Sequence, residues 1–252
     1  MLAFEQTGVA TFSYTKQEAP VYLPFLRSAD LVVCAEDAVP KDSKKVLLLS
    51  QKLLDGIFAL APQQEDGGRF LASDMPLRIQ CTSGATGRVK RMVRTAQVNE
   101  FRIWQYQNKE GYNCYSHYLL THPFSVQAIY GRANACIRMG GACVSVASDV
   151  FQAITDYGVT HLAVLPTMLA KAAAALPAGF LKPNILMIST FGAPVSRELR
   201  ERILQTLATE LIESYGTNEV GSVCTIGSDG TGLVVAGVRV EVVDKNNKPL
   251  IG

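Results

Sequence analysis

The chain has 252 residues, 48% of them hydrophobic, and its 24 lysines and arginines against 22 aspartates and glutamates leave a net charge of +2. This length and composition allow one large domain or two smaller ones with a sizeable buried core. The near-neutral charge and the lack of a basic run argue against nucleic acid or an anionic membrane as a partner. No apolar stretch reaches about 18 residues, the length of a membrane span, so we expect none.

The cysteine pattern is typical of a reducing compartment. None of the six cysteines forms a CxxC pair, and none lies at zinc-site spacing from a histidine. The first ten residues include Glu5 and lack the basic segment and apolar run of a secretory signal peptide. We therefore expect reduced, mostly buried thiols in a cytoplasmic protein. The cysteines are Cys34, Cys81, Cys114, Cys136, Cys143 and Cys224.

Short apolar runs alternate with helical segments along most of the chain, which predicts an α/β fold with mainly parallel sheets and flanking helices. The predicted strands are 31–34, 46–49, 76–80, 142–146, 161–165, 185–189 and 211–214. The predicted helices are 51–60, 95–109, 124–139, 149–157, 166–175 and 196–209. After Gly221, β-like runs at 223–226, 233–235 and 238–243, with a hairpin turn at 244–248, predict a short antiparallel element.

The segment 81–90 has the composition of a phosphate-binding loop. It reads Cys-Thr-Ser-Gly-Ala-Thr-Gly-Arg-Val-Lys and follows the predicted strand 76–80. Its glycines allow backbone N–H groups to approach an anion, its hydroxyls can donate to phosphate oxygens, and its lysine adds a positive charge. The alternative is an ordinary surface turn. A Walker loop does not match, because Gly87 is followed by Arg88 and no Ser or Thr follows Lys90.

Two further segments combine small and polar residues directly after predicted strands. Residues 215–219 read Tyr-Gly-Thr-Asn-Glu, in which the ring can stack on a base and the carboxylate can hold Mg²⁺. Residues 191–194 read Phe-Gly-Ala-Pro, in which small residues let a flat ligand lie against the backbone. The alternatives are an exposed β-turn for the first and a helix N-terminal turn for the second. Because ligands of open α/β sheets bind beyond the carboxyl ends of strands, the shared position favours a site.

Together these motifs resemble those of the adenylate-forming enzymes, which comprise acyl- and aryl-CoA ligases, luciferases and the adenylation domains of peptide synthetases. Residues 82–90 resemble the family signature Thr-Ser-Gly-Ser/Thr-Thr-Gly-x-Pro-Lys, 191–194 its Gly-Gly-Ala-Pro segment, and 215–219 its Tyr-Gly-x-Thr-Glu motif. His122 stands where the family often has a histidine at the acyl pocket, and 164–167 resemble a Val-Pro-Thr strand end. The resemblance covers about residues 20–252.

The resemblance implies that a carboxylate attacks the α-phosphate of ATP, giving an acyl-adenylate and pyrophosphate, before a thiol of coenzyme A or a carrier protein takes the acyl group. It implies catalytic roles for Lys90, Thr217 and Glu219, with Mg²⁺ on Glu219 and His122 at the substrate pocket. The residues to which it assigns nucleotide binding are Thr82, Ser83, Gly84, Thr86, Gly87, Lys90, Gly192, Ala193, Pro194, Tyr215, Gly216, Thr217 and Asn218.

The chain also departs from the family pattern. Ala85 removes a loop hydroxyl, Val89 replaces the signature proline, and Asn218 replaces a threonine, so each predicts lower activity. By the resemblance, the ribose-binding aspartate, the hinge and the small C-terminal domain with its catalytic lysine are expected beyond Gly252. We therefore expect an incomplete N-terminal α/β portion (1–80), a nucleotide-binding α/β core (81–221) and the start of a small β subdomain (222–252).

Two functions stay open at this point. The first is an acid–thiol ligase of the AMP-forming type that activates a small carboxylic acid with ATP and Mg²⁺, impaired or incomplete in this chain. The second is a non-catalytic nucleotide- or acyl-binding fragment or pseudoenzyme. Residues 121–127 offer no aspartate to hold an α-amino group, which favours an acyl or aryl acid over an amino acid.

Overall fold

The computed structural model describes residues 5, 8–43, 45–60, 72–81, 90–145, 150–176, 180 and 182–250, without the side chains of Phe58, Val150 and Phe151. The helices are α2 (Ala19–Leu26), α3 (Gln51–Phe58), α4 (Ala96–Glu110), α5 (Gln127–Arg138), α6 (Val150–Asp156), α7 (Pro166–Ala174) and α8 (Arg197–Thr206), with a short 3₁₀ turn, η1 (Glu36–Ala38). The strands are β1 (Thr11–Phe12), β2 (Val32–Cys34), β3 (Val46–Leu48), β4 (Pro76–Cys81), β5 (Arg91–Thr95), β6 (His117–Leu119), β7 (Ala142–Val144), β8 (His161–Val164), β9 (Ile185–Phe191), β10 (Ala208–Thr217), β11 (Gly221–Ile226) and β12 (Gly232–Val234).

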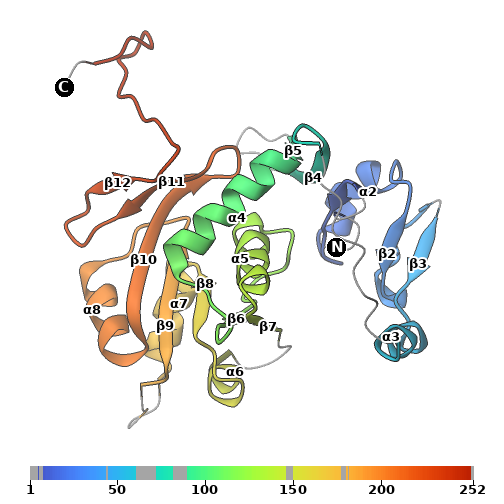
Figure 1. The fold of residues 1–252 in the computed structure, drawn as a ribbon, viewed down its shortest axis with the longest axis horizontal. Coiled ribbons are helices and arrows are strands. Elements are labelled where there is room, and N and C mark those ends of the chain that lie inside the picture. Colours follow the sequence, from blue (N-terminus) through green and yellow to red (C-terminus); the bar gives the residue numbers. More distant parts are fainter. Residues whose placement is uncertain are drawn as a thin grey trace.

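A seven-stranded sheet in the order β12-β11-β10-β9-β8-β6-β7 forms the centre of the larger part of the molecule (Figure 1). The pairs from β7 through β10 are all parallel, whereas β10–β11 and β11–β12 are antiparallel. The predicted α/β class, with mainly parallel sheets and an antiparallel element toward the C-terminal end, is thus confirmed. Strand β11 continues the same sheet, and the three-part division of the chain stays a prediction.

Two smaller sheets lie on the N-terminal side (Figure 1). Strands β1, β4 and β5 form one of them, in which β4 is parallel to β1 and antiparallel to β5. Strands β2 and β3 pair in parallel and form the other. The two strands on either side of residues 82–89 in the sequence, β4 and β5, are thus antiparallel neighbours in a small sheet.

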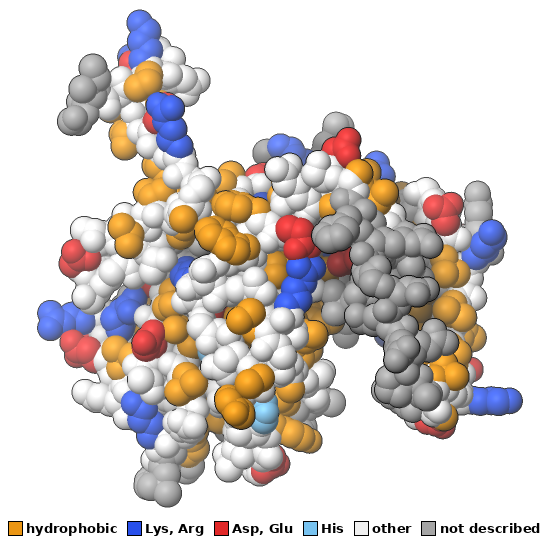
Figure 2. Space-filling view, in the orientation of Figure 1, with side chains coloured by type: hydrophobic (Ala, Val, Ile, Leu, Met, Phe, Trp, Pro, Cys, Tyr) orange, Lys and Arg blue, Asp and Glu red, His pale blue; other side chains and the backbone are white. Residues whose placement is uncertain are grey.

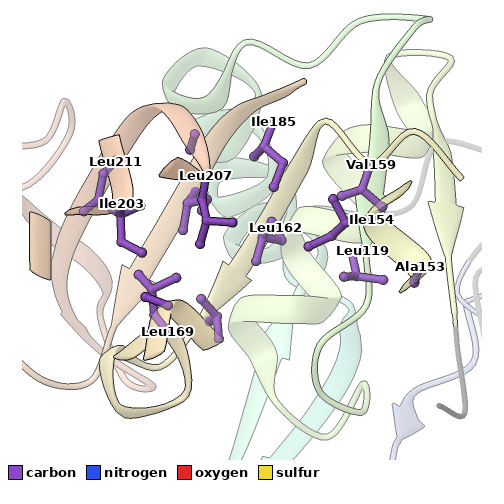
Figure 3. Close-up of a cluster of buried hydrophobic side chains, with 14 residues drawn as sticks. Leu119, Ala153, Ile154, Val159, Leu162, Leu169, Ile185, Ile203, Leu207 and Leu211 are labelled. Atoms are coloured by element: carbon purple, nitrogen blue, oxygen red, sulfur yellow. The ribbon is translucent and has the colours of Figure 1, made fainter. Parts of the chain in front are cut away.

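Alternation along β8 divides the core into two layers. Leu162 and Val164 point into one hydrophobic cluster, which is completed by side chains of α6, α7, α8, β9 and β10 (Figure 3). Ala163 points to the opposite face and into a second cluster with Ile103 of α4 and Ile129 of α5. Because successive strand residues face opposite sides, this pattern places α4 and α5 on one face of the sheet and α6, α7 and α8 on the other.

Several predicted boundaries were wrong. Helix α5 begins at Gln127 rather than at residue 124, since Val126 is extended and serves as its N-cap. Helix α8 ends at Thr206, and the three residues after Leu207 join β10, where Ala208 pairs with Ile185. Pairing with a buried neighbouring strand here outweighs the helix propensity of this segment.

The predicted strand 238–243 was also wrong, although the hairpin turn after it is present. Residues 238–243 make only an isolated bridge between Val243 and Pro249, and both Val240 and Val242 are exposed. No other described strand pairs with this segment, so its alternating pattern finds no partner. Strands β1, β5 and β6 and helix α2 were not predicted.

The six cysteines are all described, and none forms a disulfide. The expectation that most are buried was wrong: Cys34 and Cys136 are buried, Cys114 is exposed, and the other three are intermediate. Among the described residues, no helix combines the length and the apolar character that crossing a membrane requires.

Candidate functional site

The carboxyl ends of neighbouring parallel strands bring two of the predicted segments together. Strand β9 pairs in parallel with β10, and its last residue, Phe191, lies opposite Ser214. The segment 192–194 therefore leaves the sheet beside Tyr215, although the two are more than twenty residues apart in sequence. Sheet pairing thus places two predicted ligand-binding segments at one edge, as expected for a crevice beyond strand ends.

Residues 192–194 form an exposed connection between β9 and α8. Gly192 adopts a φ of 87°, a conformation that favours glycine, and a Cβ at this position would lie 3.2 Å from Leu165 Cδ2. Helix α8 begins only at Arg197, with Ser196 as N-cap accepting from the Leu199 N–H at 3.2 Å. The alternative that Pro194 stands near the first helical position is therefore wrong, because the helix starts three residues later.

Residues 215–219 are a strand end followed by a hairpin turn. Tyr215, Gly216 and Thr217 belong to β10, with a β-bulge between Tyr215 and Gly216, and residues 218–220 form the turn to β11. The predicted end of this strand at residue 214 was too early. All five side-chain positions are exposed, Tyr215 by 59%. The Thr217 hydroxyl accepts from the Val220 N–H at 3.2 Å and so closes the turn.

Gly216 allows the two strands of this hairpin to approach closely. A Cβ at Gly216 would lie 2.2 Å from the carbonyl oxygen of Gly221, a distance that no side chain tolerates. Gly221 itself has a φ of 92°. Both glycines are therefore required by the backbone path, and the segment needs its small residues for structure as well as for any ligand.

Arg94 and Arg102 hold the turn 218–220 from beneath, and sequence reasoning missed both. Arg94 of β5 donates to the carbonyl oxygen of Asn218 at 2.5 Å. Arg102 of α4 donates to the same oxygen at 3.2 Å and to the carbonyl oxygen of Glu219 at 2.7 Å. These bonds connect the N-terminal half of the chain with the turn and leave the Asn218 and Glu219 side chains accessible.

His122 lies near the same sheet edge, after β6. Its Nδ1 is 2.9 Å from the Thr121 hydroxyl oxygen, which in turn donates to the carbonyl of Ala163. The rings of His122 and Phe191 are 6.3 Å apart between centroids. Burial lowers the pKa of His122, so its imidazole is neutral at pH 7. A neutral imidazole beside a phenyl ring is better suited to lining a pocket for an apolar acid than to binding a carboxylate, for which a positive charge would be needed.

A buried polar network lies beneath this edge. Glu110 at the end of α4 accepts from Arg132 Nε at 2.7 Å, from Ser189 Oγ at 2.9 Å and from the Tyr112 hydroxyl at 2.6 Å. Its backbone carbonyl is 3.0 Å from Nε2 of His161, which is 2% exposed. The network joins α4, α5, β8 and β9, and it supports the strands that end at the candidate site.

Of the glycine-rich segment 82–90, the structure describes only Lys90. Thr82, Ser83, Gly84, Thr86 and Gly87 lie outside the described residues. Lys90 is described and exposed, directly before β5. Strand β5, which follows Lys90 directly, carries Arg94, and Arg94 donates to the carbonyl oxygen of Asn218 in the turn 218–220. Within the described residues, no group of three or more His, Cys, Asp or Glu side chains forms a metal cluster, and Glu219 is a single exposed carboxylate.

Comparison with known proteins identifies the family. Residues 18–251 match the model of the AMP-binding enzymes. The chain belongs to the AMP-binding enzyme family. The resemblance to adenylate-forming enzymes that the motifs indicated is therefore confirmed, over nearly the same range of residues.

Relatives of this AMP-binding chain differ from it widely in sequence. A 4-coumarate–CoA ligase-like protein of Arabidopsis thaliana is 34% identical over 110 residues, which are 39% of this chain and 19% of that protein. ATP-bound MatB of Rhodopseudomonas palustris is 18% identical, with a TM-score of 0.73 over 95% of this chain and 51% of MatB. The O-succinylbenzoate coenzyme A synthetase MenE of Bacillus subtilis, in complex with ATP and magnesium, is 15% identical, with a TM-score of 0.74 over 96% of this chain and 53% of MenE. The chain thus spans about half the length of these two structures, which share its fold.

Proposed function

We propose that this chain takes part in the ATP-dependent activation of a carboxylic acid to an acyl-adenylate. The observation that supports this most is the pairing of Phe191 with Ser214, which sets 192–194 beside 215–219 in a member of the AMP-binding family. In this proposal, Tyr215 and 192–194 contact the adenine, and Thr217 and Asn218 bind near the α-phosphate. The hydroxyls and glycines of 82–87, with Lys90, bind the β- and γ-phosphates.

The proposed attack on the α-phosphate of ATP requires groups that stabilise the negative charge that develops on the phosphates. A carboxylate oxygen of the acid forms a bond to the α-phosphorus, the bond from that phosphorus to the bridging oxygen breaks, and pyrophosphate leaves with the electron pair. Backbone N–H groups, hydroxyls and a lysine stabilise the transferred charge when they are held in place beforehand. Lys90 and Thr217 are the residues proposed for this role.

Mg²⁺ is the proposed metal, and Glu219 its proposed protein ligand. The Glu219 carboxylate is exposed, and no described side chain bonds to it, so it is free to reach a cation. A single carboxylate suits Mg²⁺, which keeps several waters and is usually held by one or two carboxylates together with substrate phosphates. The metal would supply charge neutralisation on the phosphates, and the backbone of the turn would hold the carboxylate in place.

The second half-reaction is proposed by family analogy. A thiol of coenzyme A or of a carrier protein would attack the acyl carbonyl, and AMP would leave. His122 and Phe191 are the proposed wall of the acid pocket, and their neutral, partly apolar surface favours an acyl or aryl acid without an amino group.

Two measurements test the proposal. We expect this chain to bind ATP, and Lys90→Ala and Glu219→Ala to weaken binding at least tenfold in the presence of Mg²⁺, as expected for loss of a charged contact. Lys171→Ala and Glu210→Ala are the matched controls, since both side chains are exposed and lie on α7 and near the start of β10, respectively. Absence of ATP binding, or equal effects of all four changes, would refute the proposed site.

Pyrophosphate exchange then tests turnover. The chain is incubated with ATP, labelled pyrophosphate and a panel of aliphatic, aromatic and amino acids. Exchange with an aliphatic or aromatic acid supports activation by this chain. ATP binding without exchange for any acid favours the non-catalytic nucleotide-binding alternative, and exchange only with amino acids contradicts the proposed substrate class.

A further inference from the structure

Beneath the turn 218–220, two buried and charged guanidinium groups, those of Arg94 and Arg102, donate to backbone carbonyls, which is unusual. Arg94 and Arg102 are each only 4% exposed, and they lie close enough for their charges to interact. Burying a guanidinium is costly unless a negative charge lies nearby. Among the described residues, no carboxylate lies within ion-pair distance of either group. Their hydrogen-bond acceptors are backbone carbonyls, which carry only partial charge.

Burial shifts the protonation equilibrium of the Arg94 guanidinium. Burial, and next the positive charge of Arg102, lower the pKa of the Arg94 guanidinium to about 9. Its Nη1 is buried and has no hydrogen-bond partner among the described residues. Tyr106 and, next, the Glu219 side chain act in the opposite direction and raise the pKa of both arginines, which favours their charged form. The pair therefore keeps its positive charge beneath the turn that carries Glu219, without an ion-pair partner in the described part of the chain.

The backbone of the hairpin is shaped to admit these side chains. A Cβ at Gly221 would lie 3.1 Å from Nε and 3.3 Å from Cζ of Arg102. Gly216 cannot carry a side chain either, because Gly221 occupies that space. Gly221 thus leaves room for the Arg102 guanidinium, which reaches two successive carbonyl oxygens, at Asn218 and Glu219, while Gly216 lets the two strands of the hairpin approach.

We propose that Arg94 and Arg102 are positioning residues that fix the turn 218–220 and so set the affinity of the Glu219 carboxylate for magnesium-bound nucleotide. The inference rests on the proposed function, in which Glu219 holds the metal. With both carbonyls drawn inward by the arginines, the Asn218 and Glu219 side chains stay on the accessible side. The buried positive charge also attracts the Glu219 carboxylate and so helps to hold it over the turn.

Two substitutions at Arg102 test the inference through ATP binding. Arg102→Met removes three hydrogen bonds and one charge, whereas Arg102→Lys keeps the charge and can keep one bond. We expect Arg102→Met to weaken ATP binding about 10- to 100-fold in the presence of Mg²⁺, the range typical of residues that orient metal ligands. Binding of ATP in EDTA should change less than about twofold, and Arg102→Lys should recover part of the loss. Arg197→Met, an exposed arginine on α8, is the control.

Hydrogen exchange provides a readout that does not depend on a ligand. The Val220 amide, which donates to the Thr217 hydroxyl, should exchange faster in Arg102→Met and in Arg94→Met, while amides in β8 and β9 keep their protection. Faster Val220 exchange with a Mg²⁺-specific loss of affinity supports the inference. Unchanged Val220 exchange, or equal losses of affinity with and without Mg²⁺, overturns it. If the wild type binds no ATP, the proposed function fails, and Val220 exchange still decides whether the arginines hold the turn.

Discussion

Glu110 and Arg132 form an ion pair in the interior of the protein, with 2.7 Å between Glu110 Oε1 and Arg132 Nε and side chains 1% and 2% exposed. The Arg132 guanidinium also lies 4.5 Å from the ring centroid of Tyr106 and 5.8 Å from that of Phe191. Because Phe191 ends the strand that precedes Gly192, the ion pair connects the helix layer with the edge of the candidate site.

Removing one member of this pair should destabilise the protein strongly. Arg132→Met leaves the Glu110 carboxylate buried without its cation, which costs about 3–5 kcal/mol of unfolding free energy. The double variant Glu110→Gln with Arg132→Met should be less destabilised, because no charge is left buried: the amide oxygen can accept from Ser189, and the amide NH2 can donate to the Tyr112 hydroxyl oxygen. Urea denaturation measures both. Arg197→Met, which breaks an exposed pair with Glu201, should cost less than about 1 kcal/mol. A double variant no more stable than the single one would contradict this interpretation.

Lys109 should make stability depend on pH. Burial, and next the charge of Arg132, lower its pKa from 10.5 to about 8, and its Nζ donates to Ser214 Oγ at 2.5 Å. Between pH 8 and 10.5 the unfolded chain binds more protons at this group than the folded chain, so its contribution to stability rises with pH. Relative to Lys109→Met, the wild type should therefore gain up to about 3 kcal/mol between pH 7 and 10.5.

The measurement for Lys109 is urea denaturation of both proteins at several pH values. Comparing the pair removes the titration of all other groups, provided that they do not couple to this site. A wild-type-minus-variant difference that stays constant from pH 7 to 10.5 would show that the Lys109 pKa is not lowered.

Gly216 should be intolerant of even a methyl group. In Gly216→Ala, the new Cβ would meet the Gly221 carbonyl oxygen at 2.2 Å, so the hairpin must separate, at a cost of about 1–3 kcal/mol. If the proposed site is right, ATP affinity falls as well. Gly56→Ala is the opposite case. Gly56 lies inside α3, and a Cβ added there would meet no atom within 4 Å outside the local helix backbone, so alanine should stabilise the helix by about 0.5–1 kcal/mol. Thermal denaturation compares the two, and a neutral Gly216→Ala would contradict the hairpin geometry.

An apolar cavity beside α7 should accept additional side-chain volume. It measures about 270 Å³ and is lined almost entirely by apolar side chains, with Ala172 among them. Filling such a space commonly raises stability by about 0.5–2 kcal/mol, so Ala172→Leu should be more stable than the wild type. Ala174→Leu, at an exposed position of the same helix, is the control and should change stability little. Chemical denaturation decides, and a destabilised Ala172→Leu would mean that the space is not available.

Much of the fold could be predicted because buried parallel strands are apolar along their whole length. The apolar runs at β2, β8 and β9 made these strands recognisable, and so did that of β3, although Leu47 and Leu48 are exposed. By contrast, β6 reads His-Tyr-Leu and β5 reads Arg-Met-Val-Arg-Thr. Six helices were predicted from their residue patterns, whereas α2 was not. Some helix ends were also missed, since pairing such as that of Ala208 with Ile185 is decided by a distant strand.

Only part of the candidate site could be predicted from the sequence. Segments 192–194 and 215–219 have recognisable residue patterns, whereas Arg94 and Arg102 look like ordinary surface charges, which arginines usually are. Their hydrogen-bond acceptors are backbone carbonyls more than 110 residues away, and a carbonyl has no signature in the sequence.

Two large hydrophobic side chains on the outer surface of α4 are exposed. Phe101 and Trp104 are 37% and 46% exposed, with ring centroids 5.8 Å apart, and hydrophobic side chains gather over this helix in Figure 2. The Phe101 ring also contacts the backbone at Gly237, so the segment after β12 crosses this surface. Replacing both rings would therefore also disturb that segment.

The separation between Arg94 and Asn218 has a consequence for biosynthesis. The arginine and its acceptor are 124 residues apart. At typical synthesis rates, roughly 6–25 s pass between their emergence from the ribosome. During that interval Arg94 of β5 and Arg102 of α4 lack the carbonyl oxygens of Asn218 and Glu219 to which they later donate. The nascent chain therefore cannot assemble the turn, or any nucleotide site built on it, until most of the large sheet has been synthesised.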